Sequence, residues 1–515
     1  MEKYGIGKQD FASLREGGFV YVDKTGYIKT LLEGAGCYFL SRPRRFGKSL
    51  FLSTLEYFFL GRRELFEGLS IDSYPWEWEE YPVIRINLGE GSYSRPQGLE
   101  ERLYEIIERI ERSYGVNPSG NDSRSRLSNL IYSLKELTGR KVVILIDEYE
   151  KPLLDTIYEG HHESYQKQLA DFYSVLKNNE ERIKMLFLTG VTRFGHLNIF
   201  SGFNNLQDIS LDDEFSSICG ITEEEMRRYL CSGIEKFAVV NHMSFEDAFD
   251  KLKDYYDGYH FSRKLIDIYN PFSLLSCLKT ARLTSQWFQS GSSRYLLDKL
   301  KKNNYDLTDM EGIRAKEETL MGVDASMNDS VTLLYQSGYL TIKEYNPQTT
   351  FYTLGIPNLE VSTSLYSIII PYYLGTNKGS VGVETYGFVE MMEEGKAENA
   401  MEWLQSYFSS IPYDVKLDYE REFQQVIYAF FALAGQLGRA TLEKQSSDGR
   451  IDMVYETRSF VYVFEFKLGE NPQSAIDQIN SKQYHLQWNA DGRKVYKIGV
   501  SFSSKSRGIS GFIIE

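Results

Sequence analysis

The sequence has little cysteine and no long apolar run. The four cysteines among 515 residues are scattered, form no C-x-x-C pair, and are Cys37, Cys219, Cys231 and Cys277. This spacing argues against a zinc site and for reduced thiols in a cytoplasm. No stretch approaches the roughly 18 uncharged apolar residues of a membrane span, and the N-terminus has no apolar signal core. We therefore expect a cytoplasmic protein without membrane association.

The chain also lacks an excess of positive charge. Its formal net charge is −14, whereas a protein that binds nucleic acid nonspecifically is usually basic. From Lys416 to the end there are 13 basic and 12 acidic residues, a net of +1, so the remainder carries −15. Any contact with nucleic acid must therefore be local, and the C-terminal region is the least unfavourable place for it.

Large aromatic side chains are abundant. The chain has 38 tyrosines and 31 phenylalanines, with 42% hydrophobic and 25% charged residues. This is the composition of a globular protein, and we expect aromatic side chains to fill its cores. The length is sufficient for about two to four domains.

A candidate phosphate-binding loop follows the apolar run 37–40, which predicts a buried strand. Gly47, Lys48 and Ser49 then open an amphipathic helix, and strand, loop, Gly-Lys-Ser and helix is the context of this loop. Free N–H groups and the helix dipole favour an anion there. We expect Lys48 to reach the β- and γ-phosphates of ATP and the Ser49 hydroxyl to ligate Mg²⁺. Arg42 replaces the first glycine of G-x-x-x-x-G-K-[ST].

A second apolar strand, 141–148, ends in two acids. This is the Walker B pattern of phosphoryl-transfer sites. Asp147 is expected to hold Mg²⁺, and Glu148 to polarise the attacking water. The alternative is a buried strand whose exit happens to be acidic.

Strands at 81–88 and 185–193 and helices at 97–113 and 124–138 complete an alternating pattern. Such alternation predicts a parallel sheet with ligands at the carboxyl ends of its strands. Thr189 or Thr192 is then placed to sense the γ-phosphate, and Arg193 to contact it. The alternative for Arg193 is an ion pair with a nearby acid such as Asp208.

The middle of the chain reads as mostly helical. Residues 211 to about 320 lose the strand pattern, and a capping box at 222–225 opens a helix. We expect a helical lid whose aromatic clusters are core. Residues 331–374 then read as helix, hairpin and helix, the pattern of a winged helix.

A second chemical site is predicted near the C-terminus. Residues 449–455 and 460–468 read as paired strands, and Glu465 and Lys467 share one face because side chains alternate. If residues 458–459 form a two-residue loop, Asp452 lies opposite Glu465. Two such carboxylates can hold Mg²⁺, and Lys467 can stabilise developing negative charge. The alternative is a salt bridge on a wet surface.

Further candidates for this second site lie on neighbouring helices and turns. Gln478 lies on a predicted helix after the strand pair, and Tyr484 follows it. Glu422 opens an apolar helix upstream and could supply another carboxylate.

Taken together, these motifs resemble the predicted AAA-ATPase-like family that carries a C-terminal PD-(D/E)XK nuclease-superfamily domain. The resemblance covers nearly the whole chain. It is carried by residues 4–6, 21–25, 42–49, 147–152, 189–194, 257–261, 269–272, 449–452, 465–467 and Gln478.

In that family the form Arg-Pro-Arg-Arg-Phe-Gly-Lys-Ser is usual, so the resemblance implies that Arg42 is normal there. Arg44 and Arg45 are candidates to replace the role of the glycine by contacting phosphates. Glu150 stands where the family usually has Asp, and we expect little effect because the charge is kept. Members look like bacterial proteins.

The expected fold is α/β. It comprises a P-loop AAA-like ATPase domain with a parallel sheet (1–210), a helical lid (211–325), a winged-helix-like module and connector (326–415) and a restriction-endonuclease-like PD-(D/E)XK domain (416–515). The leading interpretation is an ATP-binding, ATP-hydrolysing protein coupled to an Mg²⁺-dependent nuclease-like domain that acts on DNA or RNA. The rival is a nucleotide-gated switch whose C-terminal domain binds nucleic acid or a protein partner without cleaving. The sequence leaves the oligomeric state open.

Overall fold

The computed structural model describes residues 2–193, 205–286, 296, 299–300, 302–303, 305, 310–322, 329–374, 381–409, 420–433, 438–446, 449–488, 491–503 and 508–515. The chain forms two compact units, one of Met1–Thr284 with Ile313–Pro357 and the other of Ser285–Gly312 with Asn358–Glu515. The four-part division expected from the sequence does not follow these boundaries, because part of the predicted lid (285–312) and part of the predicted winged-helix module (358–415) fall in the second unit. That division stays a prediction. No helix in these ranges is long and apolar enough to cross a membrane.

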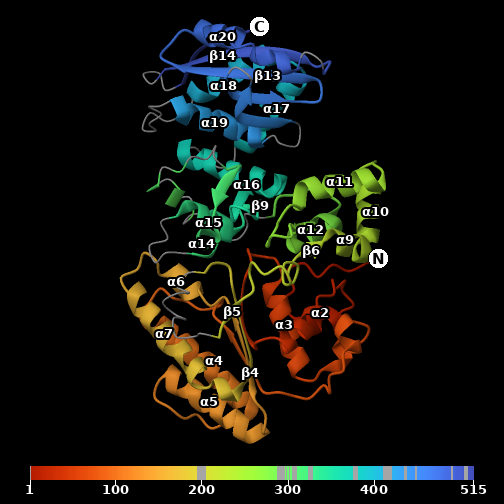
Figure 1. The fold of residues 1–515 in the computed structure, drawn as a ribbon, viewed down its shortest axis with the longest axis vertical. Coiled ribbons are helices and arrows are strands. Elements are labelled where there is room, and N and C mark those ends of the chain that lie inside the picture. Colours follow the sequence, from red (N-terminus) through yellow and green to blue (C-terminus); the bar gives the residue numbers. More distant parts are fainter. Residues whose placement is uncertain are drawn as a thin grey trace. The chain divides into compact units, whose positions relative to one another are not determined.

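The first unit is built on a five-stranded parallel sheet in the order β2-β3-β4-β1-β5 (Figure 1). Its strands are β1 (Cys37–Ser41), β2 (Val83–Asn87), β3 (Val142–Asp147), β4 (Ile183–Gly190) and β5 (Gln207–Asp208). Every residue of β3 is buried, as is typical of a parallel strand covered on both faces. The predicted parallel sheet is confirmed, and the two-residue β5 is an addition to it.

Helices cover both faces of this sheet. Figure 1 shows α3 (Lys48–Phe59) on one face and α4 (Gly98–Tyr114), α5 (Ser123–Thr138) and α7 (His162–Asn178) on the other. Shorter helices are α1 (Phe11–Glu16), α2 (Gly26–Glu33) and α6 (Lys151–Asp155). Because parallel strands end at one edge of the sheet, the loops after β1, β3 and β4 lie at the same edge.

The segment after β5 is largely helical, as predicted. Its helices are α9 (Glu223–Tyr229), α10 (Cys231–Val240), α11 (Phe245–Tyr256) and α12 (Pro271–Thr280). The capping box is present: the Thr222 hydroxyl accepts from the Glu225 N–H, and the Glu225 carboxylate accepts from the Thr222 N–H. The structure adds a two-stranded ribbon of β6 (Ile221–Thr222) and β7 (Ile268–Tyr269).

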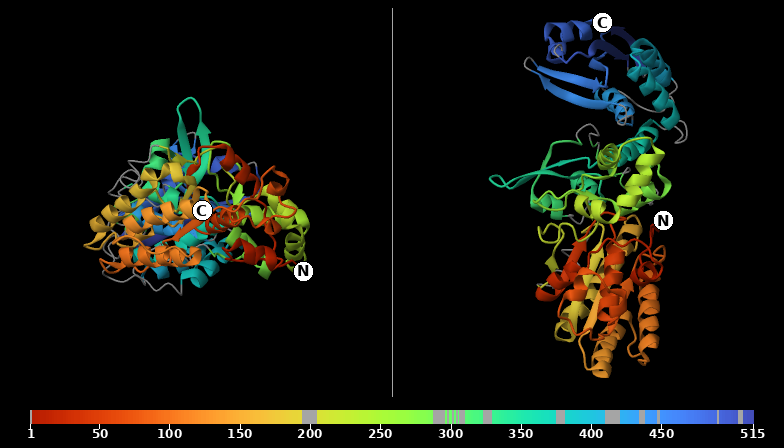
Figure 2. Two further views of the ribbon diagram at one scale, coloured as in Figure 1. Left: turned by 90° about the horizontal axis from the view of Figure 1, so that it is seen from below. Right: turned by 90° about the vertical axis from the view of Figure 1, so that its right-hand side faces the viewer.

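The returning segment of the first unit is a three-stranded antiparallel sheet with two helices. The sheet has the order β8-β10-β9, with β8 (Ile313–Ala315), β9 (Thr341–Asn346) and β10 (Phe351–Gly355), and the helices are α14 (Glu317–Met321) and α15 (Ser330–Ser337). The β9–β10 hairpin projects as a long ribbon in the right-hand view of Figure 2. The predicted hairpin is present, and α15 ends at Gly338 (φ +84°), the left-handed conformation that a glycine adopts easily after a helix.

The second unit contains a mixed sheet in the order β11-β12-β13-β14-β15. Its strands are β11 (Arg439–Ser446), β12 (Gly449–Glu456), β13 (Phe460–Leu468), β14 (Lys494–Ser503) and β15 (Gly508–Ile514). Only β13 and β14 pair in parallel, and α20 (Pro472–Ser481) lies between them in the chain. The other helices of the unit include α16 (Leu359–Leu374), α17 (Val381–Glu393), α18 (Ala397–Ser409) and α19 (Glu420–Leu433).

The two faces of β13 pack against different partners. Val461 and Val463 join a core that also contains Ile476 and Ile479 of α20. On the other face, the ring of Phe464 lies 5.4 Å from that of Phe431 on α19. This is the alternation predicted from the sequence, with Glu465 and Lys467 on the α20 face.

Candidate functional site

The loop between β1 and α3 is closed around Lys48. Its Nζ donates to the carbonyl oxygens of Arg42 (2.8 Å) and Pro43 (3.0 Å). Gly47 precedes the helix at φ +98°, a conformation that glycine adopts easily. Burial lowers the pKa of Lys48, and the negative charges of Asp147 and Glu150 oppose that shift. The ammonium therefore lies at the N-terminus of α3 within the electrostatic reach of the acids that follow β3.

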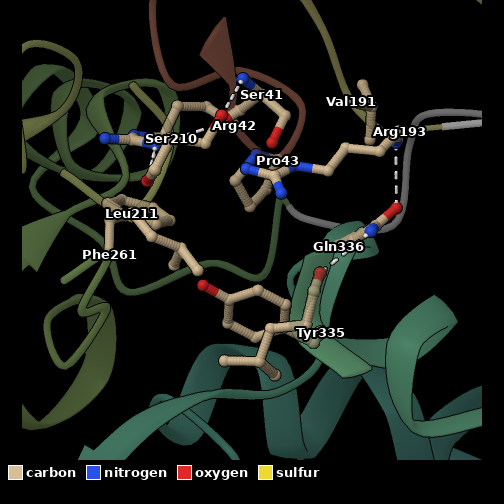
Figure 3. A pocket seen from close by; sticks show the side chains of 11 residues that line it. Ser41, Arg42, Pro43, Val191, Arg193, Ser210, Leu211, Phe261, Tyr335 and Gln336 are labelled. Atoms are coloured by element: carbon tan, nitrogen blue, oxygen red, sulfur yellow. Dashed lines mark hydrogen bonds between the residues drawn. The ribbon is translucent and has the colours of Figure 1, made fainter. Parts of the chain in front are cut away.

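Arg42 turns its side chain away from the loop. Its guanidinium donates to the carbonyls of Ser210 (2.7 Å) and Phe215 (3.0 Å) and lies 4.3 Å from the ring centroid of Phe261. Figure 3 shows this side chain reaching Ser210. An arginine is therefore accommodated at the glycine position because its side chain fills the space beside the loop and ties β1 to the chain that follows β5.

Arg44 and Arg45 are both half-buried. The Arg45 backbone has φ +67°, and its guanidinium carbon lies 3.8 Å from the ring centroid of Phe272 on α12. This stacking links the loop to the helical segment. Phosphate contact by either arginine stays a prediction.

The acids after β3 occupy distinct positions. Asp147 is buried, and its Oδ1 accepts a hydrogen bond of 2.7 Å from the Thr189 hydroxyl on β4. Glu148 has φ +52°, and a Cβ built on Gly89 would stand 2.6 Å from its Oε2. The Glu148 carboxylate therefore occupies the space that a side chain at Gly89, just after β2, would fill. Sequence reasoning missed this glycine.

Glu150 is a buried acid. The sequence predicted only that Glu in place of the usual Asp would have little effect here. Its Oε1 accepts from the backbone N–H groups of Val191 and Thr192, the latter at 3.0 Å. Burial raises the pKa of Glu150 to about 7, and these N–H bonds and the charge of Lys48 oppose the shift. Only the spacing of three residues after Asp147 could have pointed to this acid.

Thr192 and Arg193 follow β4, and both are buried. The Thr192 Oγ1 has no hydrogen-bond partner within the described part of the chain. Arg193 is ion-paired with Asp208 at 2.7 Å, the alternative raised from the sequence, and also contacts the sulfur of Met321. Its backbone N–H donates to Gln336 of α15 at 3.0 Å (Figure 3). Whether Arg193 also contacts a nucleotide stays a prediction.

A small pocket lies beside the loop between β1 and α3 and the end of β4 (Figure 3). It has about 20 Å³ of water-accessible space, enough for a single water molecule. It is lined by Ser41, Arg42, Pro43, Val191, Arg193, Ser210, Leu211, Phe261, Leu320, Tyr335 and Gln336. The lining therefore joins the end of β1, the end of β4 and α15.

The donor set at this edge of the sheet suits Mg²⁺. Ser49 lies in the first turn of α3. Asp147 ends β3, and β4 lies between β3 and β1 in the sheet. Hydroxyl and carboxylate oxygens are the ligands that Mg²⁺ prefers. The residues present fit the metal, with the Thr189 hydrogen bond fixing the orientation of the Asp147 carboxylate.

In the second unit, Asp452, Glu465 and Lys467 converge. The strands pair from Glu456↔Val461 to Met453↔Phe464, and one further step in the same register, which the two-residue loop predicts, would place Asp452 opposite Glu465. Glu465 is buried, and its Oε1 accepts from the Lys467 Nζ at 2.9 Å. Asp452 Oδ2 accepts from the Phe466 N–H at 2.8 Å. The acids and the lysine thus form one polar cluster at the end of a hydrophobic sheet.

The pKa of Asp452 is raised, first of all by burial. Hydrogen bonds from the Phe466 N–H and from Glu465, together with the charges of Lys467 and Arg450, oppose this shift. Repulsion between two neighbouring carboxylates would also raise one of their pKa values. Here burial is the largest cause of the shift, and the hydrogen bond from Glu465 lowers the pKa of Asp452.

The other predicted members of this second site are Gln478, Tyr484 and Glu422. Gln478 is half-buried on α20, and Tyr484 is buried in the core that α20 covers. Glu422 belongs to α19, and its side chain is outside the described part of the structure. No described contact joins Gln478 or Tyr484 to Asp452 or Glu465.

Two carboxylates across a strand pair also suit Mg²⁺ or Mn²⁺. Within the ranges that the structure describes, no group of three or more His, Cys, Asp and Glu side chains could hold a metal. If a metal binds here, Asp452 and Glu465 would be its acidic ligands, and backbone or water oxygens would complete its coordination.

Comparisons with known proteins match both units. Residues 5–200 match the family model described as predicted AAA-ATPase, and residues 418–511 match that of the PD-(D/E)XK nuclease superfamily. A protein of Azotobacter chroococcum mcd 1, described as an uncharacterized protein in the vnfD 5′ region, is 34% identical over 529 residues, which cover 100% of this chain and 99% of that protein. A solved structure of the ORC2 protein of Aeropyrum pernix, in ADPNP and ADP complexes, aligns with 15% identity and a TM-score of 0.24, over 65% of this chain and 87% of that one. A TM-score this low does not establish a shared fold.

Proposed function

The chain belongs to the predicted AAA-ATPase family and also carries a PD-(D/E)XK nuclease-superfamily domain, and from this premise we propose that it binds and hydrolyses ATP and cleaves nucleic acid with a divalent metal. The observation that carries the first activity is the meeting of Lys48, Asp147 and Glu148 at one edge of the parallel sheet. The second activity rests on the convergence of Asp452, Glu465 and Lys467.

In the nucleotide site, Lys48 binds the β- and γ-phosphates in exchange for its bonds to loop carbonyls. Ser49 and Asp147 would hold Mg²⁺, which supplies charge neutralisation between the phosphates. Glu148 orients the attacking water and accepts its proton, and the Thr192 hydroxyl donates to the γ-phosphate. Thr189 orients Asp147 through their hydrogen bond and so takes a supporting part.

In the C-terminal site, Asp452 and Glu465 would hold Mg²⁺ or Mn²⁺, which supplies an activated water and polarises a phosphodiester. Lys467 stays beside Glu465 and stabilises the negative charge that develops on the phosphate. DNA and RNA both offer this bond. The near-neutral charge of the C-terminal region makes it the part of the chain that an anionic polymer approaches at least cost.

The test is a cleavage assay with the full-length chain on single-stranded DNA, double-stranded DNA and RNA, with Mg²⁺ or Mn²⁺, and with or without ATP. We expect metal-dependent cleavage that Asp452→Ala abolishes and that ATP alters in rate. Binding of nucleic acid without cleavage under every condition would instead support the nucleotide-gated switch as the function of this protein.

A further inference from the structure

The turn after β4 is held on both sides of Thr192 by two consecutive residues of the segment after β3. The Glu150 carboxylate accepts from the Thr192 N–H at 3.0 Å and from the Val191 N–H. The Tyr149 hydroxyl donates to the Thr192 carbonyl oxygen at 3.1 Å. Both polar groups of the Thr192 backbone are therefore fixed by side chains that directly follow the Asp147–Glu148 pair.

The two holding side chains have little freedom of their own. Tyr149 is fully buried, and its ring meets the ring of Phe39 on β1 edge-on, with centroids 5.4 Å apart. A Cβ built on Gly190 would lie 2.3 Å from Glu150 Oε2 and 2.8 Å from the Tyr149 ring. The absence of a side chain at Gly190 thus lets the two segments approach closely, and the backbone N–H of Tyr149 also donates to the Thr189 carbonyl at 3.3 Å.

Thr192 is only 4% exposed, and its hydroxyl has no hydrogen-bond partner in the described ranges. A buried hydroxyl without a partner is costly, because it has lost water and gained nothing in return. The turn lies at the sheet edge that carries Lys48, whose charge acts on Glu150. An acceptor group of a ligand bound at that edge, such as a phosphate oxygen, would satisfy the hydroxyl.

We propose that Tyr149 and Glu150 are positioning residues that hold Thr192 so that its hydroxyl donates to the γ-phosphate of ATP. The inference rests on the proposed nucleotide site and adds the means by which that site distinguishes ATP from ADP. ADP lacks the γ-phosphate, so it leaves the Thr192 hydroxyl unsatisfied. ATP satisfies this hydroxyl, and because the turn is already fixed, binding does not have to order it.

Four single variants and one double variant test this inference in the full-length chain. Thr192→Val removes the hydroxyl and keeps the side-chain shape. Glu150→Ala removes the acceptor, Glu150→Gln keeps an oxygen acceptor without the charge, and Tyr149→Phe removes only the hydroxyl that holds the Thr192 carbonyl. The double variant combines Glu150→Ala with Thr192→Val. The measurements are kcat and KM for ATP, the affinities for ADP and for a slowly hydrolysed ATP analogue, and thermal melts that report folding.

We expect Thr192→Val to lower kcat about 100-fold, the scale of one lost transition-state donor, with ADP affinity unchanged. Glu150→Ala should lose about 10- to 100-fold in kcat and lose the preference for the ATP analogue over ADP, because a misplaced donor is nearly as poor as none. Glu150→Gln should recover most of that loss, and Tyr149→Phe should cost about 10-fold. The double variant should be no worse than Thr192→Val alone, because all three residues act through one hydroxyl.

Each contrary outcome has a distinct meaning. Wild-type kcat and nucleotide preference in a folded Glu150→Ala, together with a defect in Thr192→Val, would overturn the positioning role and leave the ATPase function standing. Losses that multiply in the double variant, or a Glu150→Gln as poor as Glu150→Ala, would show that Glu150 acts by itself. If Glu150→Ala does not fold, Tyr149→Phe decides the question. A wild-type protein that binds no ATP would overturn the proposed function itself.

Discussion

Arg42 shows how a single residue can depart from a motif and still preserve its geometry. The sequence located the loop because Gly47, Lys48 and Ser49 are adjacent in the chain. It could not show where the Arg42 side chain goes, because its acceptors Ser210 and Phe215 lie 168 and 173 residues further along. The same limit applies to Tyr149 and Glu150, whose partners on β4 become neighbours only when the sheet forms.

Replacement of Arg42 by glycine should restore the common form of the motif and yet weaken the fold. The substitution leaves the buried carbonyls of Ser210 and Phe215 without their donor, at about 1–3 kcal/mol for each unsatisfied group. We expect denaturant unfolding of Arg42→Gly to show a loss on the order of 2–6 kcal/mol. An equal stability of variant and wild type would mean that the guanidinium has no structural role.

The assigned roles of Lys48 and Glu148 predict different defects. Lys48→Ala should abolish ATP binding, because the charge that meets the β- and γ-phosphates is gone, whereas Glu148→Gln should bind ATP and fail to turn it over. Binding titrations and phosphate release measure the two effects separately. Lys177→Ala, a change of an exposed lysine on α7, is the matched control and should leave both unchanged. Equal hydrolysis by wild type and Glu148→Gln would refute the role of Glu148.

The raised pKa of Glu150 predicts a pH dependence of stability. A carboxyl with a folded pKa of about 7 and an ordinary unfolded value near 4.3 binds its proton more tightly in the folded state. The loss of unfolding free energy that Glu150 causes is therefore smallest below about pH 4.3, grows as the pH rises to about 7, and is constant above that. Glu150→Gln should remove this slope, raising the unfolding free energy at pH 8 relative to pH 4 on the order of 3 kcal/mol.

The measurement is a series of urea midpoints from pH 4 to pH 8 for wild type and Glu150→Gln. Asp257→Asn is the comparison, because burial also raises the pKa of Asp257 to about 7, with the nearby Asp267 adding to the shift. A difference between wild type and Glu150→Gln that does not change with pH would show that Glu150 titrates normally in the folded protein.

Among the elements, those defined by local sequence were predictable. The β12–β13 hairpin has the register set by a two-residue loop, and its recorded pairs end at Met453↔Phe464, one residue before Asp452 and Glu465. Counting residues from the loop was therefore enough to predict that these two acids lie near each other. The strands β5 and β8 were not foreseen, because two or three residues carry no periodic pattern and their pairing depends on neighbours from elsewhere in the chain. The helix α20 was foreseen, but its close approach to β14 was not.

That approach predicts the effect of a side chain at Gly499. A Cβ there would lie 2.6 Å from the Pro472 carbonyl oxygen and 2.9 Å from Ile476 Cγ1, so Gly499→Ala must displace α20. We expect a loss of about 1–3 kcal/mol in unfolding free energy, the usual cost of overpacking. Gly511→Ala is the control, because its nearest contact would be an ordinary 3.6 Å. The same loss in both variants would mean that α20 adapts to a methyl group at Gly499.

For the whole molecule, the sequence separates two chemical sites by some 300 residues but does not reveal how the chain divides between them. Residues Ser285–Gly312 belong to the second unit although they interrupt the first, and Ile313–Pro357 return to the first. Such an exchange depends on contacts between distant segments, which a local pattern does not encode. It means that neither unit is a continuous stretch of chain, so their ligands are best tested in the intact protein.

Two separate sites predict two separable ligand effects on unfolding of the full-length chain. Divalent metal alone should stabilise the unit that contains Asp452 and Glu465, and ATP added with Mg²⁺ should stabilise the unit that contains Lys48. A ligand at 100 times its dissociation constant adds about 2.7 kcal/mol, so each shift should be several degrees.

Asp452→Ala should lose only the metal effect, and Lys48→Ala only the ATP effect. Lys467→Ala should keep both, because it removes no metal ligand, and yet be inactive in cleavage. A metal shift that survives in Asp452→Ala would place the ion elsewhere, and an ATP shift that survives in Lys48→Ala would refute the nucleotide site.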